Sequence, residues 1–161
     1  MITEEYNQAV DLYSDAIFRF VLKNCRDEDK AKDVVQDTYE KLWKNHKNVN
    51  FSKVKSYLFS TAYHTLIDSI RRDKKRGSWE EVKEKELSHS NSYSDLNEIL
   101  HQALEQLPEK QKMVVLLRDY EGYAYNEISE ITGLTESQVK VYIFRARKFL
   151  KTYIGKVEVL I

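Results

Sequence analysis

Apolar residues recur at spacings of three and four along most of this 161-residue chain, a period that predicts helices rather than strands. A first helix is expected from Thr3 to about Asn24 and a second from its cap residue, Asp27, to about Asn45. After the loop that follows, Ser52 is expected to cap a third helix. One proline and four glycines supply few turns for a sheet, so the predicted fold class is all-α.

Each of these three helices has one apolar stripe that should face a core. The stripes comprise Ala9, Leu12, Tyr13, Ile17, Phe20 and Val21 in the first helix, Ala31, Val34, Val35, Thr38 and Leu42 in the second, and Leu58, Ala62, Leu66 and Ile70 in the third. The three helices should therefore form one N-terminal lobe.

The C-terminal part predicts a helix-turn-helix. A helix from near Ser94 should bury Ile99, Leu100, Ala103, Leu104 and Leu107, and Pro108 at an N1-like position should start another helix through Leu117. A helix over 125–132 should end at Gly133, which can adopt the left-handed conformation. Thr135 and Gln138 have capping-box spacing and mark the start of the next helix.

The last helix combines an apolar stripe with a basic outer face. Val139, Ile143, Ala146 and Leu150 should face the core, which leaves outward Ser137, Val141, Phe144, Arg145 and Lys148, flanked by Gln138, Lys140 and Arg147. Six basic residues and one acidic residue lie between Thr135 and Lys156. Such a helix suits the major groove of DNA, although a solvated amphipathic helix is the alternative interpretation.

A polar segment separates the two lobes. Residues 77–93 are rich in Ser, Glu and Lys, with Trp79 as a lone aromatic residue, and are predicted to be a linker. The chain has no net charge, but 1–76 carry 15 basic and 12 acidic residues, whereas 77–106 carry 2 and 7. This segregation suggests that the lobes, rather than the connection, meet a polyanion.

Two outward faces of the N-terminal lobe are candidate binding surfaces. The second helix directs Asp33, Gln36, Asp37, Glu40 and Lys44 outward. This mainly acidic face suits a protein partner better than DNA, unless it serves only solubility. The third helix directs outward a stripe of Tyr57, Thr61, His64, Asp68, Arg71 and Lys75 that ends in the basic cluster at 71–76. Rings interleaved with cations suit single-stranded or opened DNA, unless the cluster is only a solvated helix end.

Nothing in the sequence predicts catalysis. It contains no Gly-rich phosphate loop, closely spaced metal ligands or nucleophile pattern, so no catalytic residue, metal or cofactor is expected. Cys25 is the one cysteine and is interpreted as a packed residue in a reducing, cytoplasmic setting. No apolar run is long enough to span a membrane, and no secretory segment opens the chain.

Three segments together resemble the extracytoplasmic function (ECF) group of sigma factors, in the sigma-70 superfamily. These are DKAKDVVQDTYEKLW at 29–43, YLFSTAYHTLIDSIRR at 57–72 and the helix-turn-helix segment at 107–151. The resemblance implies a three-helix sigma region 2 domain over 1–76, a flexible linker over 77–93 and a sigma region 4 domain over 94–161. It also implies a role in promoter-directed transcription initiation, with core RNA polymerase and promoter DNA as partners. The expected location is the bacterial cytoplasm, and neither catalysis nor membrane insertion is expected.

The resemblance also assigns roles to residues. Core polymerase, through the clamp helices of its largest subunit, would contact Asp33, Gln36 and Asp37. The minus-ten element would meet Tyr57, Thr61, His64, Asp68, Arg71, Arg72 and Lys75, and the loop around 48–55 would hold a flipped base. The minus-thirty-five element would meet Ser137, Gln138, Lys140, Val141, Arg145, Arg147 and Lys148.

This chain departs from the family pattern at a few positions. His64 stands where many relatives have Asn, Ser129 where Ala is usual, and Ala124 where a Ser or Thr cap is usual. Residues 155–161 have no recognised counterpart. An anti-sigma factor is a further candidate partner. The alternative functions are a stand-alone regulator that binds duplex operator DNA and a helical adaptor or enzyme.

Overall fold

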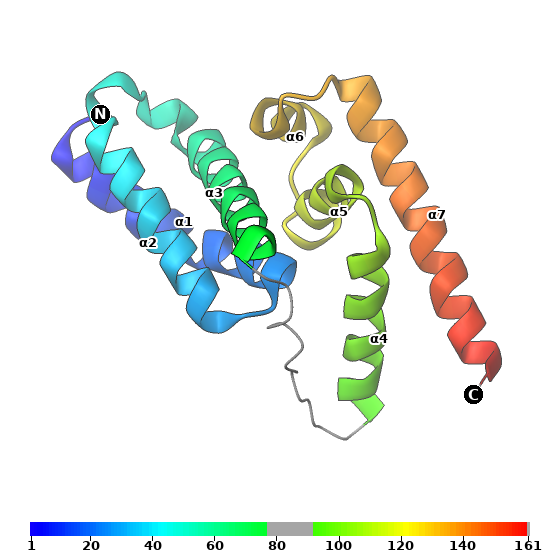
Figure 1. Cartoon of the computed structure of the whole chain (residues 1–161). Coiled ribbons are helices and arrows are strands. Elements are labelled where there is room, and N and C mark those ends of the chain that lie inside the picture. Colours follow the sequence, from blue (N-terminus) through cyan, green and yellow to red (C-terminus); the bar gives the residue numbers. More distant parts are fainter. Residues whose placement is uncertain (77–91, 161) are drawn as a thin grey trace. The chain divides into compact units, whose positions relative to one another are not determined.

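The computed structural model describes residues 1–76 and 92–160, and all regular elements there are helical (Figure 1). Their order is α1 (Thr3–Cys25), α2 (Glu28–Lys44), η1 (His46–Asn48), η2 (Phe51–Lys53), α3 (Val54–Arg76), α4 (Ser92–Gln106), α5 (Glu109–Val115), η4 (Leu116–Tyr120), α6 (Tyr125–Thr132) and α7 (Glu136–Leu160). The chain forms two compact units, centred on α1–α3 and on α4–α7. The all-α prediction is confirmed. Residues 77–91 of the predicted linker, including Trp79, lie outside the described residues. Helix α4 begins at Ser92, just before the predicted end of the linker.

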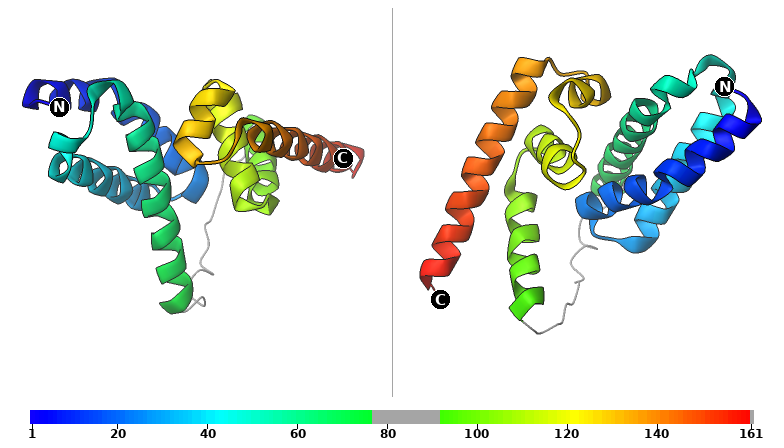
Figure 2. Two further views of the ribbon diagram at one scale, coloured as in Figure 1. Left: turned by 90° about the horizontal axis from the view of Figure 1, so that it is seen from above. Right: turned by 180° about the vertical axis from the view of Figure 1, so that it is seen from behind.

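The first unit is built from three helices that all pack on one another, as the views in Figure 2 show. Its core contains most residues of the predicted stripes, with Ile17, Phe20, Leu42, Leu58 and Leu66 among the fully buried side chains, whereas Tyr13, Val35 and Ile70 are half-buried. The rings of Phe20 on α1 and Phe59 on α3 meet edge to face, with centroids 5.4 Å apart. This aromatic contact joins the first helix to the third at the centre of the unit.

The α1–α2 junction follows the predicted boundaries. Arg26 has a φ of 55° and ends α1, and Asp27 Oδ1 accepts the Lys30 N–H at 3.1 Å at the start of α2. A carboxylate here satisfies an amide that the first turn leaves without a helical partner. Ser52, predicted as the cap of the third helix, instead lies inside the 3₁₀ turn η2, and α3 follows directly.

Several core assignments in the first unit differ from the prediction, since Phe59 and Ile67 on α3 are buried although neither was assigned to the core. Leu12 was expected inside but is 55% exposed, because it lies at the edge of the α1 stripe. Tyr39 was not assigned to the core but is buried, and its hydroxyl donates to the Ala9 carbonyl at 3.3 Å. A tyrosine ring can be buried there because its polar end has a partner on α1.

In the second unit, α7 packs against α5 and α4. Val139, Ile143 and Ala146 are buried as predicted, whereas Leu150 is half-buried. They contact a core that includes Leu104 from α4 and Met113, Val114 and Val115 from α5. The predicted inward stripe of the last helix is therefore the one that anchors it.

The helix-turn-helix connection has the predicted local chemistry. Gly133 has a φ of 81°, a conformation that other residues adopt at a cost. The Thr135 N–H donates to Gln138 Oε1 at 3.0 Å, and the Gln138 N–H donates to Thr135 Oγ1 at 3.1 Å, which completes the capping box. Ser129 Oγ donates to the Leu134 carbonyl at 2.6 Å, so this hydroxyl ties α6 to the turn.

The segment before α6 differs from the prediction. Pro108 is the cap before α5 rather than its first residue. The helix was expected to continue through Leu117, but α5 ends at Val115 and a π-helical turn follows over Leu116–Tyr120. The Glu121 N–H reaches the Leu116 carbonyl at 3.1 Å, five residues back. A π turn inserts an extra residue and so changes which side chains face the neighbouring helices.

Replacement of Phe20 by alanine should destabilise the first unit strongly. The substitution removes a fully buried ring and its contact with Phe59, for which we expect a loss of about 3–5 kcal/mol in the free energy of unfolding. Urea denaturation followed by circular dichroism measures it. Leu12→Ala is the matched control and should change stability by less than about 1 kcal/mol, because Leu12 is mostly exposed. Equal losses in the two variants would contradict this description of the core.

Candidate functional site

The acidic face on α2 is exposed as predicted. Asp33, Gln36 and Asp37 are all exposed, while Val34 and Thr38 on the opposite side are buried. Thr38 Oγ1 donates to the Val34 carbonyl at 2.7 Å, so this buried hydroxyl is satisfied within the helix. The packed inner face therefore holds the three polar side chains on a rigid surface.

The predicted stripe on α3 is exposed to solvent along most of its length. His64, Asp68, Arg71 and Lys75 are exposed, and Tyr57 and Thr61 are half-buried. His64 Nδ1 lies 2.8 Å from the Ser60 carbonyl, so in the neutral ring Nδ1 carries the proton and Nε2 is the acceptor. A neutral His64 can thus accept a hydrogen bond from a base through Nε2.

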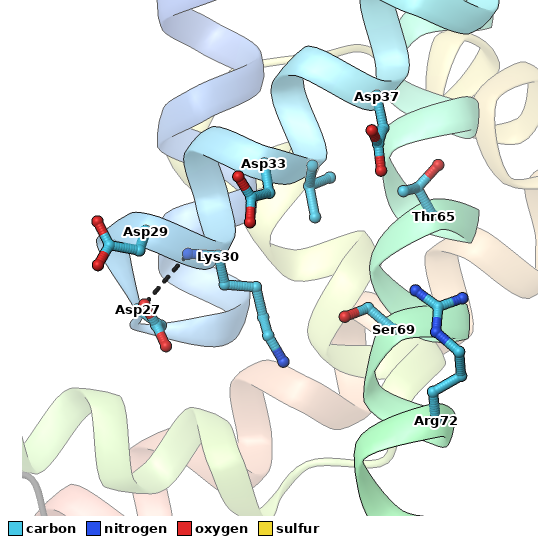
Figure 3. A pocket seen from close by; sticks show the side chains of 9 residues that line it. Asp27, Asp29, Lys30, Asp33, Asp37, Thr65, Ser69 and Arg72 are labelled. Atoms are coloured by element: carbon cyan, nitrogen blue, oxygen red, sulfur yellow. Dashed lines mark hydrogen bonds between the residues drawn. The ribbon is translucent and has the colours of Figure 1, made fainter.

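Arg72 is placed differently from the other members of the predicted minus-ten set. It lines a groove between α2 and α3 together with Asp33 and Asp37 of the acidic face (Figure 3). On α3 it lies beside Thr65 and Ser69, which line the same groove. The structure therefore brings Arg72 together with the predicted polymerase-binding residues.

An aromatic cluster that the sequence reasoning did not identify adjoins the loop between α2 and α3. The Trp43 ring stacks on His46 with centroids 4.4 Å apart and planes 12° apart, and Tyr6 meets Trp43 edge to face at 5.0 Å. Trp43 is 45% exposed. The sequence signal was a Trp and a His three residues apart at a helix end. The stacking orders the start of the loop predicted to hold a flipped base.

The outer face of α7 carries the predicted minus-thirty-five residues. Ser137, Gln138, Lys140, Val141, Arg145 and Lys148 are all exposed. Phe144 lies on the same face and is 67% exposed. The helix thus presents cations, polar groups and apolar groups to one side.

Arg147 belongs to the same predicted set but has a partner inside the unit. Its Nε donates to Asp119 Oδ2 at 3.0 Å, and its Nη2 donates to Asp119 Oδ1 at 2.5 Å. The hydrogen bond to Asp119 raises the pKa of Arg147, so the guanidinium stays charged. This bidentate pair ties α7 to the π turn.

The residue before Asp119 ties the same π turn to α6. Arg118 lies over the Tyr125 ring at 4.4 Å and donates to the Tyr123 carbonyl at 2.9 Å. Lys140 on α7 lies 5.5 Å from the same ring. Sequence reasoning did not identify this arrangement, because the π turn decides where Arg118 and Asp119 point. The turn therefore holds both helices of the helix-turn-helix.

Other kinds of site find no support among the described residues. No group of three or more His, Cys, Asp or Glu there is placed to hold a metal ion. Burial raises the pKa of the Cys25 thiol, which disfavours the reactive thiolate. No described helix has both the length and the apolar character needed to cross a bilayer.

Comparisons with known proteins match both units. Residues 9–76 match the family model of sigma-70 region 2, and residues 97–150 match that of sigma-70, region 4. RNA polymerase sigma factor SigV of Bacillus subtilis is 30% identical over 142 residues, which cover 86% of this chain and 84% of the relative. ECF RNA polymerase sigma factor SigM of the same organism is 27% identical over 153 residues, which cover 90% and 92%.

Solved structures agree with this assignment. The sigma factor RpoE, in complex with the anti-sigma factor NepR from Bartonella quintana, aligns with a TM-score of 0.78 and 25% identity over 95% of this chain and 98% of that one. CnrH, in complex with the cytosolic domain of CnrY, shares the fold, with a TM-score of 0.74 at 19% identity over 94% of this chain and 88% of that one. The chain therefore belongs to the extracytoplasmic function group of the sigma-70 family of RNA polymerase sigma factors.

Proposed function

We propose that this sigma factor binds core RNA polymerase through α2, opens and reads the minus-ten element with α3, and reads the minus-thirty-five element with α7, without catalysis of its own. The observation that carries the proposal is the first unit, where an acidic face and an aromatic, basic stripe occupy neighbouring helices. A stand-alone operator-binding regulator needs neither surface. The match of residues 9–76 to sigma-70 region 2 also disfavours that alternative.

The polymerase-binding face consists of Asp33, Gln36 and Asp37. Two carboxylates one helical turn apart suit a basic surface on the largest polymerase subunit, where the clamp helices are the expected contact. The same charges repel DNA phosphates, which keeps this face clear of the promoter. The face therefore favours a protein partner.

The minus-ten surface consists of Tyr57, Thr61, His64, Asp68, Arg71 and Lys75. Arg71 and Lys75 are exposed cations that can hold the backbone of an opened strand. Tyr57 and His64 supply rings on which unstacked bases can lie. Such contacts stabilise opened DNA and so favour melting.

The minus-thirty-five surface lies along α7. Arg145, Lys148 and Lys140 can contact phosphates or guanine edges, and Val141 can contact a thymine methyl group. Gln138 uses its oxygen in the capping box, so its amide N–H₂ group is the end directed at bases. Ser137, in the first turn of α7, can contact bases or phosphates.

Arg147 has a positioning role in this proposal rather than a contact with DNA. Its bidentate pair with Asp119 holds α7 against the π turn while Arg118 holds the start of α6. The Arg147–Asp119 pair and the Arg118 contact together set the orientation of the recognition helix α7. Asp119 is therefore as important for promoter reading as Arg147, although neither touches DNA.

An inhibitory partner is the remaining part of the proposal. The RpoE neighbour was solved in complex with the anti-sigma factor NepR, and the CnrH neighbour in complex with the cytosolic domain of CnrY. We infer that this chain is also restrained by an anti-sigma factor. The exposed apolar side chains of α7, Phe144 and Phe149, are surfaces that such a partner could cover.

Asp37→Lys should abolish measurable binding to core RNA polymerase. The substitution reverses a charge at the centre of the proposed face, and because Asp37 is exposed the fold should be unaffected. Fluorescence anisotropy of labelled protein titrated with core enzyme measures the affinity. Asp11→Lys, on the exposed side of α1, is the control for the charge change and should bind normally. Normal binding by Asp37→Lys would refute the assignment of this face.

Loss of Arg145 and Lys148 together should flatten the salt dependence of binding to minus-thirty-five duplex DNA. Each phosphate contact contributes about −0.9 to the slope of log K against log salt, so the double alanine variant should have a slope shallower by about 1.8. Titrations at several salt concentrations give the slope directly. An unchanged slope would show that these side chains do not contact phosphates.

Arg147→Ala is the matched variant in the same titrations. It should weaken binding several-fold while the slope changes by much less than about 0.9, because no phosphate contact is lost. Asp119→Asn should behave in the same way, since it breaks the same pair from the other side. A shallower slope in Arg147→Ala alone would instead make Arg147 a phosphate contact.

A further inference from the structure

A groove between α2 and α3 is lined mainly by polar side chains. It has a volume of about 370 Å³ and is shown in Figure 3. One wall carries Asp29, Asp33 and Asp37 from α2, and the other carries Thr65, Ser69 and Arg72 from α3. Acidic groups and a guanidinium thus face one hollow from opposite helices.

These charges are not neutralised within the unit. Lys30, which also lines the groove from α2, forms an ion pair with Asp73 of α3. Among the described residues, no ion pair within 4.0 Å involves Asp33, Asp37 or Arg72. Lys30 is occupied by Asp73, so the carboxylates and the guanidinium of the groove remain available to a partner.

A partner for this groove must carry both signs of charge. A purely basic segment would pair with Asp33 and Asp37 but would be repelled by Arg72, and a purely acidic one would meet the reverse. A basic side chain next to an acidic one satisfies both walls, because Arg72 can pair bidentately with a carboxylate. The Ser69 hydroxyl can accept or donate a further hydrogen bond, and the Thr65 hydroxyl, which already accepts from Lys41 Nζ at 2.9 Å, can donate one.

We propose that this groove is the continuation of the polymerase-binding face and receives a segment of core RNA polymerase with adjacent basic and acidic side chains. The basic side chain of this segment lies against Asp33 and Asp37, and its acidic side chain lies against Arg72. This inference rests on the proposed function, since Asp33 and Asp37 belong to both surfaces. Because the groove adjoins the polymerase-binding face and shares Asp33 and Asp37 with it, the polymerase is the expected occupant.

The inference moves Arg72 from the promoter to the polymerase. Arg71, the preceding residue, lies on the exposed stripe with His64 and Asp68 and is absent from the groove. One turn of the same helix therefore carries two arginines with different partners. This pair offers a test in which charge, helix and exposure are closely matched.

The test compares Arg72→Glu, Arg71→Glu and Asp37→Lys in the full chain, by equilibrium binding to core RNA polymerase. Arg72→Glu should weaken binding about ten-fold or more, whereas Arg71→Glu should stay within about two-fold of the unmodified chain. Arg72→Gln, which keeps the polar stem without the charge, should give an intermediate loss. Circular dichroism during thermal unfolding verifies that each variant is folded.

The outcomes separate this inference from the proposed function. If Asp37→Lys loses polymerase binding while Arg72→Glu and Arg72→Gln keep it, the groove assignment is wrong and the polymerase face stands. If neither position matters, the face fails as well. A loss in Arg72→Glu confined to single-stranded minus-ten DNA would return Arg72 to the promoter surface and overturn the inference. A loss confined to self-association, measured by sedimentation, would assign the groove to a second copy and also overturn it.

Discussion

Burial of one apolar stripe per helix is the constraint on which the rest of this structure depends. Each unit is small, and small units have thin cores, so each helix can bury only one side against its neighbours. In the first unit this burial centres on Phe20 and Phe59, and in the second on the inner side of α7. The opposite sides of α2, α3 and α7 are consequently left in solvent, and there the charged and aromatic residues gather.

Segregation of charge follows from the same constraint. The chain has no net charge, yet α2 presents carboxylates outward while the end of α3 and the outer face of α7 present cations. A neutral protein can therefore address a protein surface and a polyanion at the same time, since each partner meets only one face. The groove with Arg72 lies where the acidic face of α2 borders α3.

Local signals in the sequence were sufficient to predict most of the helices. Asp27 and the pair Thr135 and Gln138 bond to backbone amides only three residues away, and Gly133 acts through its own φ, so their roles could be inferred without knowledge of distant contacts. The family resemblance was equally accessible, because its motifs are contiguous segments. The functional residues it assigned remain proposals, although all of them are exposed except Tyr57 and Thr61, which are half-buried.

Features that depend on tertiary contacts could not be predicted. Burial of Tyr39 depends on the Ala9 carbonyl across the helix pair, and the pairing of Arg147 with Asp119 depends on a π turn that no periodicity indicates. Stepping 100° per residue placed Arg147 near the outer face of α7 correctly, but could not show which partner lies within its reach. Arg72 differs from Arg71 for the same reason, since only the position of α2 distinguishes them.

Run-off transcription from a library of random promoter sequences tests directly whether this chain directs promoter-specific initiation. Core RNA polymerase is used with and without this protein, and the transcripts are sequenced. We expect initiation, only in the presence of the protein, from sites that share two motifs at a fixed spacing. No protein-dependent initiation, together with retained binding to duplex DNA, would contradict it and favour an operator-binding regulator.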